Sequence, residues 1–428
     1  MRKLMNAFII LLGVSFAGVL DPINVKQKNN YFVPFSDIQI TNIALAGNPA
    51  VIAVNKRAKI GLSGTINTSK ESFSSNILDT DQFLESGGGV NYYEDKTDYK
   101  SNKYEHLNFY FVSNYSDNWF EISYDVENNN RKVEYENLGI RNIYGTPSIR
   151  RIEATDHTNE QIETIALTWA REFKWFTSGL RIALNKRSVE RKYVYTDIYE
   201  TIPNPYYDIG DREYQNTNVN PYWSVALGLA KDIANNQKVL LAHNFGSEKN
   251  ETLTSREVDS SGDIKYYYSF GDYGYRTPDT TALGYVYTVN ENLELAGSFT
   301  RVWGQEYTHI QEQFTEYESS IKEKREPYDI YGLVISWQVI DNILELQGYG
   351  HYANNAGAGV TDMGWYKADT QAVNRTQIGG SIIFSPYENH NIALSFMRSV
   401  EEALPIDDSY YHLIWEYTTG ELAYSYKF

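Results

Sequence analysis

The chain has 428 residues, of which 15% are aromatic and 22% are charged, with 37 tyrosines, no cysteine and a formal net charge of −17. A chain this rich in aromatic side chains is not disordered, and without cysteine it cannot be held together by disulfides. The negative charge argues against a nucleic-acid partner, because binding to phosphates needs clustered Lys and Arg.

The first residues have the layout of an export signal. Arg2 and Lys3 form a positive start, Ala7–Val14 form a short apolar stretch, and Ser15-Phe16-Ala17 places small residues where signal peptidase reads them. The apolar stretch is shorter than the roughly 20 residues that a membrane-spanning helix requires. We therefore predict a cleaved signal peptide over residues 1–17, with a membrane anchor or a buried helix as the alternative.

Residues 18–57 form a short N-terminal segment before the first clear strand, and they are too few for a large folded plug domain. The segment contains Asn48-Pro49-Ala50 close to its end. Asn-Pro is an ordinary turn signal, so a linker is the simpler interpretation of this tripeptide taken alone.

From residue 58 onward, runs of about ten residues alternate apolar and polar side chains, which is the pattern of β-strands. His106–Asn114 and Trp119–Glu127 form one such pair, and the Ser116-Asp117-Asn118 cluster between them favours a tight turn. Similar pairs of runs follow as far as the C-terminus, most of them joined by short turns rich in Asn, Asp and Glu.

Long polar segments separate these hairpins, and we predict them as loops. They are Ser69–Glu105, Asn128–Glu160, Thr201–Asn220, Ser247–Thr280, Gln305–Glu326 and Ala353–Asn374. Short turns and long loops therefore alternate along the chain, as they do in transmembrane β-barrels with short periplasmic turns and long outer loops.

A soluble β-sandwich would also alternate in this way, so strand length and aromatic placement decide between the two folds. The runs are close to the roughly 9–11 residues of a membrane strand. Aromatic residues gather at the ends of the runs, as in an interfacial girdle. They are Trp119, Phe120, Trp169, Phe173, Trp175, Trp223, Trp303, Trp337 and Trp415. Both features favour the membrane barrel.

The number of strands follows from the runs. Starting at Ala58–Asn67, we count fourteen runs through Ser409–Tyr417, and Glu421–Phe428 would be a fifteenth. An even number is expected when both termini lie in the periplasm, so either one run is not a strand or a strand near Ser36–Leu45 has been missed. We predict an all-β, transmembrane, antiparallel up-and-down barrel over residues 58–428 with about 14 strands, or alternatively 16.

The last eight residues alternate once more and end on an aromatic side chain. We expect Tyr424, Tyr426 and Phe428 to face lipid. This pattern resembles the C-terminal signature of bacterial outer-membrane barrels, which implies recognition by the barrel-assembly machinery. A strand that closes a soluble sheet is the alternative.

The position of Asn48-Pro49-Ala50 just before the first long strand resembles the long-chain fatty-acid transporter (FadL-like) family, whose N-terminal hatch carries this motif. Total length and strand count are also similar. The Gly- and Ser-rich stretch that usually precedes the motif is missing. The resemblance implies passive uptake of hydrophobic molecules, which bind in apolar pockets and leave sideways through the wall beside a kinked strand. Gly332 and Gly379-Gly380 are candidates for such a kink.

No catalytic, cofactor or metal motif is present: none of the seven histidines belongs to an HExxH pattern or to a close set of His and carboxylate ligands. Lys186, Arg187, Arg191 and Lys192 form a basic group near the upper end of a long strand. We interpret this group as a contact for lipopolysaccharide phosphates or for anions in the pore, with a solvated loop base as the alternative.

Together these features predict a passive channel in the bacterial outer membrane and not an enzyme. The predicted substrates are hydrophobic small molecules such as fatty acids or aromatics, and the predicted partners are outer-membrane lipid, lipopolysaccharide and the barrel-assembly machinery. A general diffusion porin with a polar lumen is one alternative. A structural or adhesive barrel with partner-binding loops is another.

Overall fold

The structure is a computed structural model that describes residues 48–54, 58–69, 72–75, 92–143, 146–201, 206–208, 212–258, 264–276, 278–312, 318–356, 358–362, 367–370, 373–387, 389–403 and 414–427. The predicted signal peptide, most of the N-terminal segment and the candidate strand at residues 36–45 lie outside these ranges. Among the described residues, no helix is both long and apolar enough to cross a bilayer.

Antiparallel strands make up almost all of the described chain, together with one short helix, α3 (Val51–Val54). The wall consists of β1 (Lys59–Ser69), β3 (Tyr92–Tyr115), β4 (Asn118–Ile143), β5 (Thr146–Glu172), β6 (Thr177–Thr201), β8 (Arg212–Ala234), β9 (Gln237–Phe245), β12 (Thr280–Asn290), β13 (Leu293–Val302), β16 (Tyr328–Ile340), β17 (Leu344–Ala356), β20 (Val373–Tyr387), β21 (His390–Ala403) and β22 (Ile414–Lys427). The predicted all-β, antiparallel up-and-down architecture is confirmed.

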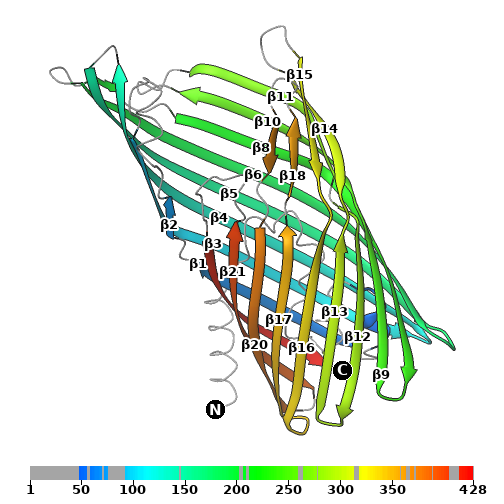
Figure 1. Cartoon of the computed structure of the whole chain (residues 1–428). Coiled ribbons are helices and arrows are strands. Elements are labelled where there is room, and N and C mark those ends of the chain that lie inside the picture. The colour runs from blue at the N-terminus through cyan, green and yellow to red at the C-terminus, as the bar shows by residue number, and fades with distance from the viewer. Residues whose placement is uncertain are drawn as a thin grey trace, which may run out of the picture.

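Each strand of this wall pairs with the next one in the order just given. The first strand, β1, pairs with β3 on one side and with β22 on the other, so the two ends of the strand order meet. In Figure 1, β3 to β8 cross the view obliquely, and β12 to β20 stand more upright.

The two faces of the wall carry different side chains. Large apolar side chains are exposed on one face, which we call the outward face; examples are Ile122, Ile165, Leu167, Leu333 and Phe396. Buried small or polar side chains occupy the alternate positions, on the inward face; examples are Ala166, Thr168, Ala183, Ser381 and Ser395. This is the reverse of a soluble protein and suits a wall with lipid outside.

Several segments that the sequence predicts as loops are in fact strand. β4 has 26 residues and β5 has 27, and they pair from Asn118 opposite Arg171 as far as Ile143 opposite Thr146. At roughly 3.3 Å per residue, such strands are more than twice as long as the ~30 Å hydrocarbon layer is thick. Backbone pairing does not require apolar side chains, so the sheet continues where both faces meet water.

The remaining strands lie in the same predicted loops. They are β2 (Ser72–Ser75), β7 (Tyr206–Asp208), β10 (Glu248–Val258), β11 (Ile264–Arg276), β14 (Gln305–Glu312), β15 (Glu318–Arg325), β18 (Gly359–Asp362) and β19 (Lys367–Thr370). β10 pairs with the first half of β8 and extends the wall, whereas β14, β15, β18 and β19 form a separate four-stranded sheet.

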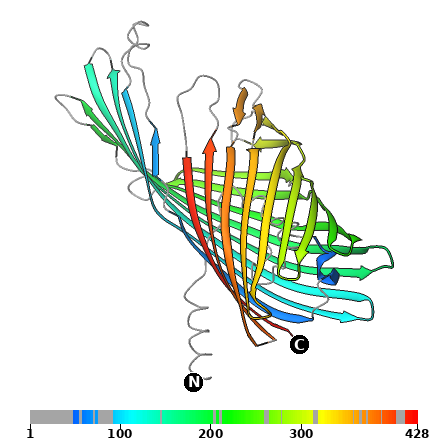
Figure 2. The same cartoon turned by 60° about the horizontal axis from the view of Figure 1, so that its bottom comes forward.

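The odd count of runs is corrected at the C-terminal end. The runs at 409–417 and 421–428 belong to one strand, β22, whose pairing with β21 passes through Thr418, Thr419 and Gly420 without a shift. The sequence therefore counts one strand too many, because a Thr-Thr-Gly stretch can remain extended and need not turn the chain. In Figure 2 the C-terminus lies at the end of the wall that carries the short turns.

The candidate kinks are also placed differently from the prediction. Gly332, Gly379 and Gly380 pair in regular register with both neighbouring strands. A shift inside the wall instead separates Asn185 and Arg187 of β6, opposite Tyr222 and Val219 of β8. The extra residue on β8 falls beside Pro221, which has no backbone N–H to donate to the ladder.

Candidate functional site

A row of small residues crosses the inward face of five neighbouring strands. Ala170, Gly179, Gly228, Ala242 and Ala282 pair in turn from β5 to β12. Directly paired residues on adjacent strands share a face, so this part of the wall carries no bulky side chain. Another piece of chain can therefore approach the backbone of the wall closely.

The Asn48-Pro49-Ala50 motif occupies this place. A Cβ atom added to Gly228 would overlap the Asn48 Oδ1 atom, and one added to Gly179 would overlap the backbone of Pro49 and Ala50. Gly179 and Gly228 are paired with each other. The motif is thus seated on two glycines whose missing side chains make the contact possible, the recognised reason for glycine inside a strand.

Hydrogen bonds hold the motif on this seat. The Asn48 Nδ2 atom donates to the carbonyl oxygens of Leu229 (3.3 Å) and Leu241 (3.2 Å), which face each other on β8 and β9. The Asn48 Oδ1 atom accepts from the Ala50 backbone N–H (2.9 Å), as a helix N-cap does. One buried amide therefore both starts α3 and fixes it to the wall.

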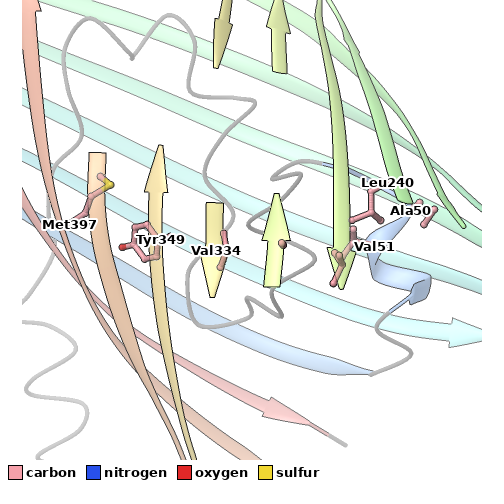
Figure 3. Packing of buried hydrophobic residues seen from close by; sticks show 9 residues of the cluster. Ala50, Val51, Leu240, Val334, Tyr349 and Met397 are labelled. Atoms are coloured by element: carbon pink, nitrogen blue, oxygen red, sulfur yellow. The ribbon is translucent and has the colours of Figure 1, made fainter. Parts of the chain in front are cut away.

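The helix α3 then contributes to two apolar clusters. Ala50 and Val51 belong to a cluster that continues along the wall through Leu240, Val286, Ala296, Val334, Tyr349 and Met397. Figure 3 shows Ala50 and Val51 beside Leu240, with Val334, Tyr349 and Met397 further along. Ala53 belongs to a second cluster with Tyr110, Val112, Trp119 and Ala170. The motif and its helix thus lie on the inward face, where both clusters meet them.

We call the inward residues Val286, Ala296, Val334, Tyr349 and Met397 the apolar belt. Their register places them in one row from β12 to β21, in which Tyr349 packs over Gly379. The next inward row is polar: Thr288 donates to Glu294 (3.0 Å), and the Ser381 and Ser395 hydroxyls lie 2.8 Å apart. The inward surface therefore changes from polar to apolar over one row.

The four predicted basic residues do not form one group. The Arg187 side chain is partly buried on the inward face and pairs with the buried Glu160, with 2.6 Å between Nε and Oε1. Lys186 and Lys192 are exposed and alternate with it along β6, and Arg191 takes the register position opposite Thr158. The structure thus separates Arg187 from the two exposed lysines.

The C-terminal aromatics lie on the outward face. Tyr424 and Tyr426 are paired with Leu62 and Ile60, which are both exposed. His390 lies beside them, with its Nδ1 atom 2.8 Å from the Tyr424 hydroxyl. Phe428 lies outside the described residues. In the part of the chain that is described, no group of three His, Cys, Asp or Glu side chains could hold a metal ion.

Comparisons with known proteins place the fold. No family model and no curated protein matches the chain. Among solved structures, the toluene transporter TodX of P. putida is 12% identical and matches 90% of this chain and 94% of its own, with a TM-score of 0.53. A FadL homologue of Pseudomonas aeruginosa is 14% identical and matches 90% and 93%, with a TM-score of 0.55. The CymD monoaromatic hydrocarbon channel is 9% identical and matches 89% and 91%, with a TM-score of 0.52.

The chain has the fold of the FadL-type barrels. The resemblance predicted from the sequence is confirmed at the level of the fold. Sequence reasoning missed Gly179 and Gly228 beneath the motif, although each is a lone glycine inside an alternating run, at "TSGLR" and "VALGLA". Such a glycine often marks a close backbone approach and was the signal available.

Proposed function

We propose that the protein is a passive channel for hydrophobic small molecules in the bacterial outer membrane. The observation that carries the proposal is the apolar belt on the inward face, next to the seated Asn48-Pro49-Ala50 motif. A general diffusion porin needs a wet, charged constriction, whereas a path for hydrocarbons needs buried apolar side chains. Named solved structures with this fold include transporters of toluene and of monoaromatic hydrocarbons, which supports the same proposal.

In this proposal residues 1–17 direct export and are removed, and residues 18–57 form a hatch that enters the wall at Asn48. The outward aromatics Tyr424 and Tyr426 belong to the segment that the barrel-assembly machinery recognises. The register shift at Pro221 is the wall irregularity at which a substrate leaves sideways. Asn185 now bridges this place, since its Nδ2 atom donates to the Tyr222 carbonyl (3.3 Å) and the Ser224 hydroxyl (3.0 Å).

The experiment is uptake into liposomes by the mature protein, with toluene and a labelled long-chain fatty acid as substrates and a small sugar as the hydrophilic comparison. We expect hydrocarbon uptake above that of empty liposomes and no sugar uptake. Conductance in planar bilayers tests the porin alternative, because large, stable ion currents would reject a hydrophobic path.

Matched variants test the belt itself. Val286→Thr/Val334→Thr keeps the shape of two buried belt residues and adds two hydroxyls, which costs about 1–3 kcal/mol for each one left without a partner. We expect hydrocarbon uptake to fall about fivefold or more. Val289→Thr/Val339→Thr makes the same change at exposed positions on the same two strands and should leave uptake unchanged.

A further inference from the structure

A row of basic and aromatic residues crosses the extended part of the wall at one level. Lys132 of β4 pairs with His157 of β5, and His157 pairs with Lys192 of β6. The row continues through Tyr214 of β8 and Arg256 of β10 to Tyr267 of β11. We call these six positions the basic row.

By their register, the positions of the basic row belong to the outward face. Along β5, His157 shares the face of exposed Gln161 and Ile165, whereas Glu160 and Ile162 on the alternate face are buried. Lys192 is exposed as well. The row is therefore a continuation, along the same strands, of the surface that meets lipid.

Basic residues are concentrated at this level of the sheet. Lys132 and Lys192 occupy the positions directly opposite His157 on its two sides. The chain as a whole is acidic, with a net charge of −17, so such a concentration is not a consequence of composition. Glu134 and Glu190 stand two residues away along β4 and β6, one on each side of the row. An anion lying along the row would attract both lysines at once.

The distance of the basic row from the membrane determines which anionic group can reach it. His157 lies eight positions beyond Ile165 on the same strand, which is about 26 Å along it and about 20 Å above the last apolar row at a tilt near 40°. Phospholipid headgroups occupy only about 5–8 Å beyond the hydrocarbon layer. The phosphate-bearing sugars of lipopolysaccharide extend further from the membrane, to the height of this row.

We propose that the basic row binds the phosphorylated sugar core of lipopolysaccharide. This inference rests on the outer-membrane location in the proposed function, and it extends the Lys192 contact predicted from sequence to positions on five further strands. Lys132 and Lys192 supply point charges for phosphate, and His157, whose Nε2 atom lies 2.8 Å from the Asn130 Oδ1 atom, stands between them.

The test measures binding of lipopolysaccharide to the full mature protein in detergent, before and after enzymatic removal of the core phosphates. For Lys132→Gln/Lys192→Gln we expect an affinity about tenfold or more lower for the phosphorylated form, and a shallower dependence on salt. Lys174→Gln/Lys231→Gln removes the same charge from exposed positions at the short-turn end and should bind as the unaltered protein does.

The proposal is overturned if the unaltered protein binds both forms equally, or if the two double variants lose the same affinity. Far-UV circular dichroism establishes that each variant is folded. Hydrocarbon uptake into liposomes without lipopolysaccharide, measured on the same proteins, tests the proposed channel independently of this binding site.

Discussion

At the scale of single residues, the Asn48-Pro49-Ala50 motif can lie against the wall only because two residues beneath it have no side chain. Gly179 and Gly228 face each other, and neither has room for a Cβ atom beneath the motif. The sequence identifies the tripeptide, but the seat is more than 100 residues away: Asn48 and Leu229 are 181 positions apart. Because no local pattern encodes so distant a contact, sequence alone could predict the motif and not its partners.

A labelling experiment tests the seat. The chain has no cysteine, so Val51→Cys, which is smaller than valine and buried, introduces one reporter thiol. In this background Gly228→Ala should raise the rate of maleimide labelling about tenfold or more, because overpacking of this kind costs about 1–3 kcal/mol and drives the motif off the wall. Gly348→Ala is the control, since its Cβ would meet nothing within 4 Å. Equal labelling rates in the two variants would contradict the seat.

The Asn48 amide is tested separately by Asn48→Asp. The carboxylate keeps the shape and can still accept from the Ala50 N–H, but it cannot donate to the carbonyls of Leu229 and Leu241. A buried acceptor against two carbonyl oxygens is unfavourable by about 1–3 kcal/mol, so labelling of Val51→Cys should again accelerate. Asn114→Asp, at an exposed position, should have no effect.

At the scale of elements, the alternation of side chains predicts the membrane-crossing parts of the strands well and their outer ends poorly. The apolar positions of Trp119–Glu127 mark the lower part of β4, whereas the same strand continues to Ile143 through a polar stretch. Above the membrane neither face needs apolar residues, so period-two hydrophobicity disappears while the backbone pairing continues. A prediction based on alternating hydrophobicity therefore assigns a loop to residues that are still paired by backbone hydrogen bonds between strands.

The irregular β6–β8 pairing offers a prediction at this scale. Asn185 is fully buried at the register shift, where it accepts from the Thr164 hydroxyl (2.9 Å) and donates to β8. Asn185→Leu keeps the branched shape of the side chain and removes these bonds, so the free energy of unfolding should fall by roughly 2–4 kcal/mol. Urea unfolding in phospholipid vesicles, followed by tryptophan fluorescence, measures the change. Asn114→Leu, at an exposed position on β3, should stay within about 0.5 kcal/mol of the unaltered protein.

At the scale of the whole molecule, the arrangement of apolar residues outside and small or polar residues inside requires lipid around the wall. Leu167 is exposed at 54% on the outward face of β5, between Ile122 and Ile182 of the neighbouring strands. If this face meets water, Leu167→Arg should be neutral or favourable. If it meets hydrocarbon, the same change should cost about 2–4 kcal/mol near the middle of the bilayer.

The sign of the change in unfolding free energy caused by Leu167→Arg therefore shows whether this face contacts lipid or water. Urea unfolding in vesicles of defined lipid measures that change. Gln161→Arg is the matched control, because Gln161 lies on the same strand and the same face, six positions further from the membrane centre. We expect Leu167→Arg to destabilise the protein by that amount and Gln161→Arg to change it little, since an arginine there reaches water. Destabilisation by both substitutions would mean that the lipid boundary lies higher than the outward apolar rows indicate. If neither substitution destabilises the protein, the outward face does not contact lipid, and the membrane-barrel interpretation is wrong.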